Sequence, residues 1–265
     1  MAEPGNDSGG GDDKAVPISA FDLPLNRLGL SAPLHWLALG WRDFRLQPSI
    51  GLFFGFCFVA MGWALLETYQ RSPAWILWLS AGFLLLGPLL CMGLYQVSLR
   101  LERGEKPSLV DALTAWRTRT AQLAIFGFAL LILEMLWGRS ALVVFAVSFE
   151  GMPELGGSLG KLLDQENLGF LVSYLCVGAV FAGLIFAISV ISIPMILDEQ
   201  VDAITAALTS LRLCLTQPGV MLVWGALITV LVLLAMLPGF AGLLVLGPVI
   251  GHASWHAYRA AVGTR

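Results

Sequence analysis

The residues of this chain best suited to chemistry are two histidines near its carboxyl end. His252 and His256 are four positions apart, so on a helix both imidazoles share one face. Neutral imidazoles at this spacing are typical ligands of a metal ion or of haem iron. The alternative is that they anchor a helix end at the boundary between lipid and water, together with Trp255, Tyr258 and Arg259.

A carboxylate is expected to join these histidines. Asp198 follows Pro194 by four positions, and His252 follows Pro248 by the same interval. If the two segments are copies of one unit, their packing brings Asp198 beside His252, where a carboxylate would orient the imidazole. The sequence therefore predicts a polar cluster at the cytoplasmic end of the protein, made of His252, His256, Asp198 and Arg259.

The elements that must position this cluster are membrane helices. Apolar residues make up 57% of the chain and charged residues 12%, whereas a soluble domain is about one quarter charged. About 20 apolar residues in a helix cross a bilayer core of about 30 Å, and lipid leaves open sheets without partners. The uncharged stretches are Ser49–Leu66, Ala74–Leu99, Ala121–Leu133, Leu168–Leu197 and Leu213–Gly251. The last is long enough for two crossings with a turn at Pro238-Gly239, so we predict an all-α polytopic membrane protein with six transmembrane helices.

The basic residues indicate which side of the membrane each end occupies. Of the 15 lysines and arginines, all but Arg71, Arg139 and Lys161 fall on the same side of the six predicted crossings. Short loops rich in lysine and arginine stay in the cytoplasm. Both termini are therefore predicted to be cytoplasmic.

The six crossings form three pseudo-repeated helical hairpins in this prediction, over residues 31–100, 107–198 and 202–262. An arginine precedes Gln-Pro by five positions in both Arg42–Pro48 and Arg212–Pro218, and Gly82–Pro88 resembles Gly242–Pro248. Each returning helix contains a proline, at Pro88, Pro194 or Pro248, where we expect a kink.

The rest of the chain is assigned from composition and capping signals. Residues 1–23 are predicted to be a disordered cytoplasmic tail, and residues 24–265 a single membrane domain. Amphipathic helices over Pro33–Leu46 and from Ser108 to Arg119 are expected to lie at the cytoplasmic interface, the second opened by a capping box with Asp111. Gly138–Asn167 is expected to be the long outer loop.

Two stretches carry a resemblance to a known family. Ser189–Asp198 and the closing segment Gly251–Arg259 resemble the domain-of-unknown-function 2189 family of bacterial integral membrane proteins, over a region from Leu34 to Val262. The chain departs from the family pattern at Glu199 and Gln217. The resemblance implies a location in the bacterial inner membrane. Some relatives carry a cytochrome c oxidase label, which implies an association with a respiratory complex, and the family supplies no catalytic residues.

These observations leave three functional hypotheses. The first is a non-enzymatic accessory or organising component of a membrane complex, with a respiratory oxidase as the partner to test first. The second is a channel or carrier for a small neutral or lipidic solute, lined by the three helices with prolines. The third is a haem- or metal-binding redox protein that uses His252 and His256. Under the first two no cofactor is expected, the partners are the lipid bilayer and other membrane proteins, including further copies of this chain, and nothing points to nucleic acid.

Overall fold

The computed structural model describes residues 23–72, 75–148, 168–199 and 201–263, and every regular element within them is a helix. The predicted tail over 1–23 lies outside this part of the chain, except that Leu23 is described and buried. The helices are α1 (Ala32–Leu46), α2 (Pro48–Arg71), α3 (Ile76–Glu102), α4 (Leu109–Thr114), the short 3₁₀-helix η2 (Ala115–Arg119), α5 (Thr120–Ser148), α7 (Leu168–Ser189), α8 (Ser192–Asp198), α9 (Ala203–Thr216), α10 (Pro218–Met236) and α11 (Leu243–Val262).

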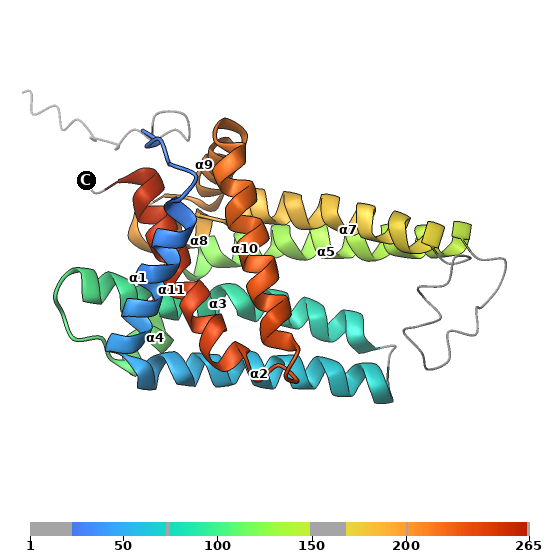
Figure 1. Ribbon diagram of the computed structural model, residues 1–265, viewed down its shortest axis with the longest axis horizontal. Helices are drawn as coiled ribbons and strands as arrows, with labels where there is room; N and C mark the ends of the chain where they lie inside the picture. The colour runs from blue at the N-terminus through green and yellow to red at the C-terminus, as the bar shows by residue number, and fades with distance from the viewer. Residues whose placement is uncertain (1–22, 73–74, 149–167, 200, 264–265) are drawn as a thin grey trace, which may run out of the picture.

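Four long helices set the shape of the molecule. α2, α3, α5 and α7 run along its long axis, and α10 and α11 cross them obliquely (Figure 1). α1, α4 and α8 gather with the C-terminal end of α11 at one end of these long helices, on the left of Figure 1. α11 packs against α1, α2, α3 and α10, so it lies at the centre of this end.

The expected membrane character is borne out by four helical segments. α2, α4 to α5, α7 to α8, and α10 are each long and apolar enough to cross a bilayer. α3 and α11 complete the six predicted crossings but are not among these four within the described residues. α11 begins with an apolar half and ends with a half that holds His252, His256 and Arg259. Six crossings remain a prediction.

At each of the two Gln-Pro sequences, Gln47-Pro48 and Gln217-Pro218, one helix ends and the next begins at once. We call each of these sharp bends an elbow. Gln47 ends α1 with φ −134° and ψ 61°, and Gln217 ends α9 with φ −133° and ψ 55°. The helical region is disfavoured for a residue before proline, and proline is well suited to the first position of the next helix. The chain therefore turns at the same backbone geometry from α1 into α2 and from α9 into α10.

Two other connections test the sequence predictions. The predicted turn at Pro238-Gly239 is present: Gly239 has φ 62°, and its carbonyl accepts a hydrogen bond from Trp63 Nε1 at 2.7 Å. The prediction that the outer loop begins at Gly138 is wrong, because α5 continues through Gly138 to Ser148. The apolar residues after Gly138 are too few to span a membrane alone, but they extend a helix that has already formed. The rest of that predicted loop, residues 149–167, lies outside the described residues.

The core under the elbows is built from large side chains. Trp36 of α1 and Trp224 of α10 are buried and meet edge to face with ring centroids 5.5 Å apart. Such a pair contributes packing and a favourable quadrupole contact between the rings. It ties the first elbow to the second, although the two tryptophans are far apart in the sequence.

The matched elbows allow a paired test of stability. Gln217 Oε1 accepts a hydrogen bond from the backbone of Leu28 at 2.7 Å, and Gln217 Nε2 donates to the carbonyl of Asn26 at 2.8 Å. Each bond contributes about 0.5–1.5 kcal/mol, so Gln217→Ala should lower the free energy of unfolding by about 1–3 kcal/mol. Denaturant titration of the protein in detergent measures this change.

Gln47→Ala is the control for this substitution. Gln47 has the same backbone geometry, and within the described residues its side chain makes no equivalent bonds to another segment. A loss as large for Gln47→Ala as for Gln217→Ala would contradict the prediction.

Candidate functional site

The predicted histidines belong to a buried polar cluster that joins α1, α3 and α11. We define this buried polar cluster as Asp43, Ser98, His252 and His256. His256 Nε2 lies 2.7 Å from Asp43 Oδ2, and His252 Nδ1 lies 2.8 Å from Ser98 Oγ. Ser98 also donates a hydrogen bond to Asp43, so the four side chains form one connected network. His252 and Ser98 are fully buried, and Asp43 and His256 are nearly so.

Glycine brings the helices close enough to form this network. A Cβ atom at Gly40 of α1 would lie 2.5 Å from the carbonyl oxygen of Val249 and 2.7 Å from the backbone nitrogen of Ala253. Only glycine fits where the backbones of α1 and α11 approach so closely. Asp43 lies one turn beyond Gly40 and is therefore held against α11.

The charge state of Asp43 is set by its neighbours. Burial raises the pKa of Asp43, because a carboxylate loses its hydration, but the hydrogen bonds from His256 and Ser98 and the charge interactions with His256 and His252 together more than offset this effect. The pKa of Asp43 is therefore below its ordinary value of 3.8, and the carboxylate is ionised at neutral pH. Arg42 Nη2 lies 3.3 Å from the other carboxylate oxygen and adds a cation at the edge of the cluster.

The two histidines use their ring nitrogens differently. His256 Nε2 is bonded to Asp43, while His252 Nε2 is buried without a hydrogen-bond partner in the described residues. His256 Nδ1 is the ring nitrogen that an ion could reach while the bond between His256 and Asp43 is kept. Within the part of the chain that the structure describes, no group of three histidine, cysteine, aspartate or glutamate side chains is placed to hold a metal ion. The metal or haem role of His252 and His256 therefore stays a hypothesis.

Asp198 and Arg259, the other two predicted site residues, meet in a second group at the same end. Arg259 Nη1 lies 3.0 Å from Asp198 Oδ2, and Arg259 Nε lies 3.2 Å from Glu102 Oε2. Tyr258 donates a hydrogen bond to Asp198 at 2.9 Å. We call Glu102, Asp198, Tyr258 and Arg259 the arginine latch, because Arg259 links α3, α8 and α11.

The structure therefore divides the predicted cluster in two. His252 was expected beside Asp198, but Asp198 accepts hydrogen bonds from Tyr258 and Arg259, and His252 bonds to Ser98. Asp43, Ser98 and Glu102 were missed by sequence reasoning. The available signal for Asp43 was a carboxylate inside a helix otherwise rich in aromatic residues and arginine, a position that is costly unless the charge is paired.

The three predicted kink prolines do not line one cavity in the described residues. Pro88 lies inside α3 and lines a pocket of about 220 Å³ between α3, η2 and α5. Pro248 lies inside α11 and is buried. Pro194 is buried in α8, just after a break at Val190-Ile191 that separates α8 from α7. This arrangement gives no support to a path lined by all three.

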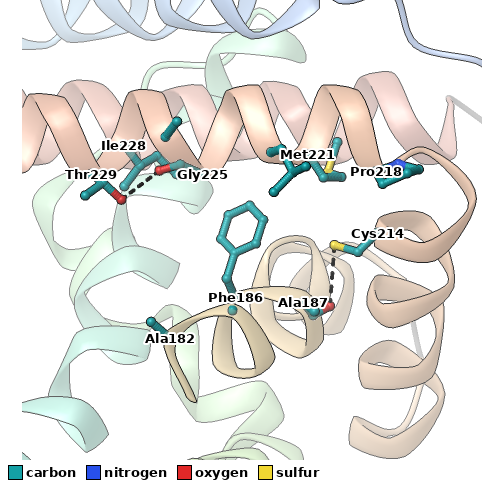
Figure 2. Close-up of a pocket in the computed structure, with 12 residues that line it drawn as sticks. Ala182, Phe186, Ala187, Cys214, Pro218, Met221, Gly225, Ile228 and Thr229 are labelled. Carbon is teal, nitrogen blue, oxygen red and sulfur yellow. Dashed lines mark hydrogen bonds between the residues drawn. The ribbon is translucent and has the colours of Figure 1, made fainter. Parts of the chain in front are cut away.

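A larger apolar groove lies between α7, α9 and α10 (Figure 2). It has a volume of about 470 Å³. Pro88, Trp116 and Gly127 of the smaller pocket correspond to Phe186, Cys214 and Gly225 of this groove, each by a shift of 98 positions. The same shift relates the four other residues of the smaller pocket to residues of the groove, namely Leu89, Thr120, Leu123 and Ala124 to Ala187, Pro218, Met221 and Leu222.

Comparison with known proteins supports the membrane assignment. Residues 76–198 match the family described as Predicted integral membrane protein (DUF2189), which confirms the resemblance over α3 to α8. The closing segment Gly251–Arg259 lies outside the matched residues. No curated protein and no solved structure matches the chain.

The buried polar cluster predicts a large effect of removing one partner. Asp43→Ala leaves His256 and Ser98 buried without their acceptor, and breaking a buried pair in this way costs about 3–5 kcal/mol. We expect Asp43→Ala to destabilise the protein by that order and Asp43→Asn, which keeps an acceptor oxygen, to destabilise it less. Unfolding in detergent followed by tryptophan fluorescence measures both.

The exposed ion pair between Glu67 and Arg71 supplies the control. Glu67→Ala removes one partner of a pair in which both side chains are exposed, so its effect should be small. Comparable losses for Asp43→Ala and Glu67→Ala would contradict the importance of the buried polar cluster.

The lowered pKa of Asp43 also predicts a dependence on pH. A carboxylate with a lower pKa in the folded state stabilises the fold above its ordinary pKa of 3.8, and this stabilisation is lost as the pH falls through the folded value. The melting temperature of the wild type should therefore fall more steeply below pH 3.8 than that of Asp43→Asn. Parallel slopes for the two proteins would show that Asp43 does not contribute.

Proposed function

We propose that this chain, whose residues 76–198 match a family of predicted integral membrane proteins, is a non-enzymatic accessory or organising component of a membrane complex. In this proposal the chain crosses the bacterial inner membrane six times as three hairpins, with both termini in the cytoplasm. The matching elbows at Gln47 and Gln217 support the repeated unit. The constant shift between the two pockets also supports it.

The observation on which the function depends is an uncovered apolar seam on α5. Only 6% of the most apolar window of the α4 to α5 segment is buried inside the protein. Ile125, Phe128, Ile132 and Met135 are between 43% and 62% exposed, at successive spacings of three, four and three residues. This spacing places them in one line along the helix, as in the seam of paired helices.

The neighbours of α5 leave this seam free. α5 packs on α3 and α7, and these contacts use other residues, among them the buried Leu123, Phe126 and Leu130. A transmembrane helix of a partner can therefore pack along the seam without displacing any helix of this protein. Association of helices in lipid depends on such side-chain packing.

The polar groups support a structural role over a catalytic one. The members of the buried polar cluster bond to one another between α1, α3 and α11, where substrate has no access. The arginine latch joins the ends of three helices. Both groups join helices at the end of the molecule where α1, α4 and α8 gather, as expected of a scaffold.

Gentle solubilisation followed by identification of co-purifying proteins tests this proposal. A respiratory oxidase, the partner suggested by the resemblance of the chain to its family, is examined first by its haem spectrum. Phe128→Ala combined with Ile132→Ala removes two side chains from the centre of the seam. We expect the partner to be recovered with the wild type and to be lost, by about tenfold or more, with this double variant.

The matched control is Val230→Ala combined with Leu234→Ala on α10. These residues have the same spacing, are similarly exposed, and lie on a different helix. The control should retain the partner. A wild type that purifies alone, or equal recovery with both double variants, would refute the proposal.

A further inference from the structure

The groove between α7, α9 and α10 is lined mainly by apolar side chains. α9 packs on both α7 and α10, and these two longer helices run in different directions (Figure 1). Phe186 projects from α7 toward α10, with Met221 and Gly225 on the facing wall (Figure 2). The volume of about 470 Å³ falls within the range of about 300–1,000 Å³ that is usual for ligand pockets.

The polar groups that line the groove are already bonded within the protein. Thr229 Oγ1 donates to the carbonyl of Gly225 at 2.8 Å, and Cys214 Sγ donates to the carbonyl of Ala187 at 3.9 Å (Figure 2). The hydroxyl and thiol protons are therefore not available to a ligand. An apolar ligand gives up no hydrogen bonds when it enters the groove, whereas a polar ligand would lose its hydrogen bonds to water without replacement.

Comparison of the two elbows shows why the groove is open. Gly55 and Gly225 each follow the proline of their elbow by seven positions. At Gly55 the backbone of Leu244 in α11 occupies the space where a side chain would be. At Gly225 the nearest atoms belong to the ring of Phe186, 3.5–3.7 Å from the position of a Cβ. The backbone of α11 therefore fills the space beside Gly55. Beside Gly225 the ring of Phe186 lies between α7 and α10 and keeps the two helices apart.

We infer that this groove binds one acyl chain of a membrane phospholipid. α10 and the segment from α7 to α8 are both apolar and long enough to cross a bilayer, so the space between them opens toward the hydrocarbon of the membrane. Without an occupant, the apolar walls of the groove would forfeit dispersion contacts. A flexible acyl chain is the occupant that the surroundings supply. The inference requires only the membrane location and does not depend on the proposed partner.

Photolabelling tests the inference with the full-length protein. The probe is phosphatidylethanolamine with a diazirine in one acyl chain, in vesicles of phosphatidylethanolamine and phosphatidylglycerol. After irradiation, labelled residues are mapped by mass spectrometry. We expect the label to concentrate on Phe186, Met221 and Thr229. Phe56 of α2 is 65% exposed and serves as the internal reference for labelling by surrounding lipid.

Two substitutions on α7 make the test specific. A Cβ at Gly183 or at Gly169 meets no heavy atom within 4 Å, so both positions accept a larger side chain, but only Gly183 lines the groove. Gly183→Leu should lower labelling of the groove about tenfold relative to Phe56. A tenfold loss of affinity corresponds to about 1.4 kcal/mol of binding free energy. Gly169→Leu should leave it unchanged, and Gly183→Ala should give an intermediate value.

Three results would overturn the inference. The first is equal labelling of the groove in Gly183→Leu and the wild type. The second is label spread evenly over the exposed faces of α5 and α10 in the wild type. The third is a cross-link between two copies of the chain through the groove, which would identify a protein helix as the occupant. Unchanged labelling of Phe56 in each variant shows that the fold is intact.

Discussion

The close approach of α11 to its neighbours is the constraint on which the rest of the structure depends. Gly40 allows α1 to reach the backbone of α11, and Gly55 allows α2 to do the same. Because α11 is enclosed in this way, its polar second half can lie inside the protein, where His252 and His256 find partners. The buried polar cluster is thus a consequence of backbone packing. Asp43 is buried where α1 meets α11, and its charge is stabilised by the bonds from His256 and Ser98 and by nearby positive charge.

The two elbows share one backbone geometry, but the helices that follow them pack differently. At the first elbow the backbone of α11 touches Gly55 of α2, and the interface is closed. At the second, Phe186 separates α7 from α10, and a groove results. α4 and η2 run into α5 without a Gln-Pro break, and the pocket there is smaller. The two elbows therefore differ in what meets their equivalent glycines, a helix backbone at Gly55 and an aromatic side chain at Gly225.

Local chemistry explains which features could be predicted from the sequence. Proline after glutamine predicts the elbows, a Pro-Gly pair predicts the turn before α11, and Ser108 caps α4 through the nitrogen of Asp111 at 3.1 Å as its spacing indicates. The partners of the two histidines could not be predicted, because Ser98 and Asp43 lie 154 and 213 positions away from them. The pairing of His252 with Asp198 failed because a break at Val190-Ile191 makes α8 a separate short helix, so equal spacing from a proline does not give equal positions.

The distribution of buried side chains determines where this protein can meet another molecule. Every member of the buried polar cluster lies between helices, and opening a path to it would separate backbones that touch at Gly40 and Gly55. The arginine latch adds a further restraint, since Arg259 bonds to carboxylates on α3 and α8. α5 and α10 carry apolar faces without such restraints, and α7 contains no buried residue. Contacts with lipid or with a partner can therefore form on α5, α7 and α10 while α11 and its neighbours stay fixed.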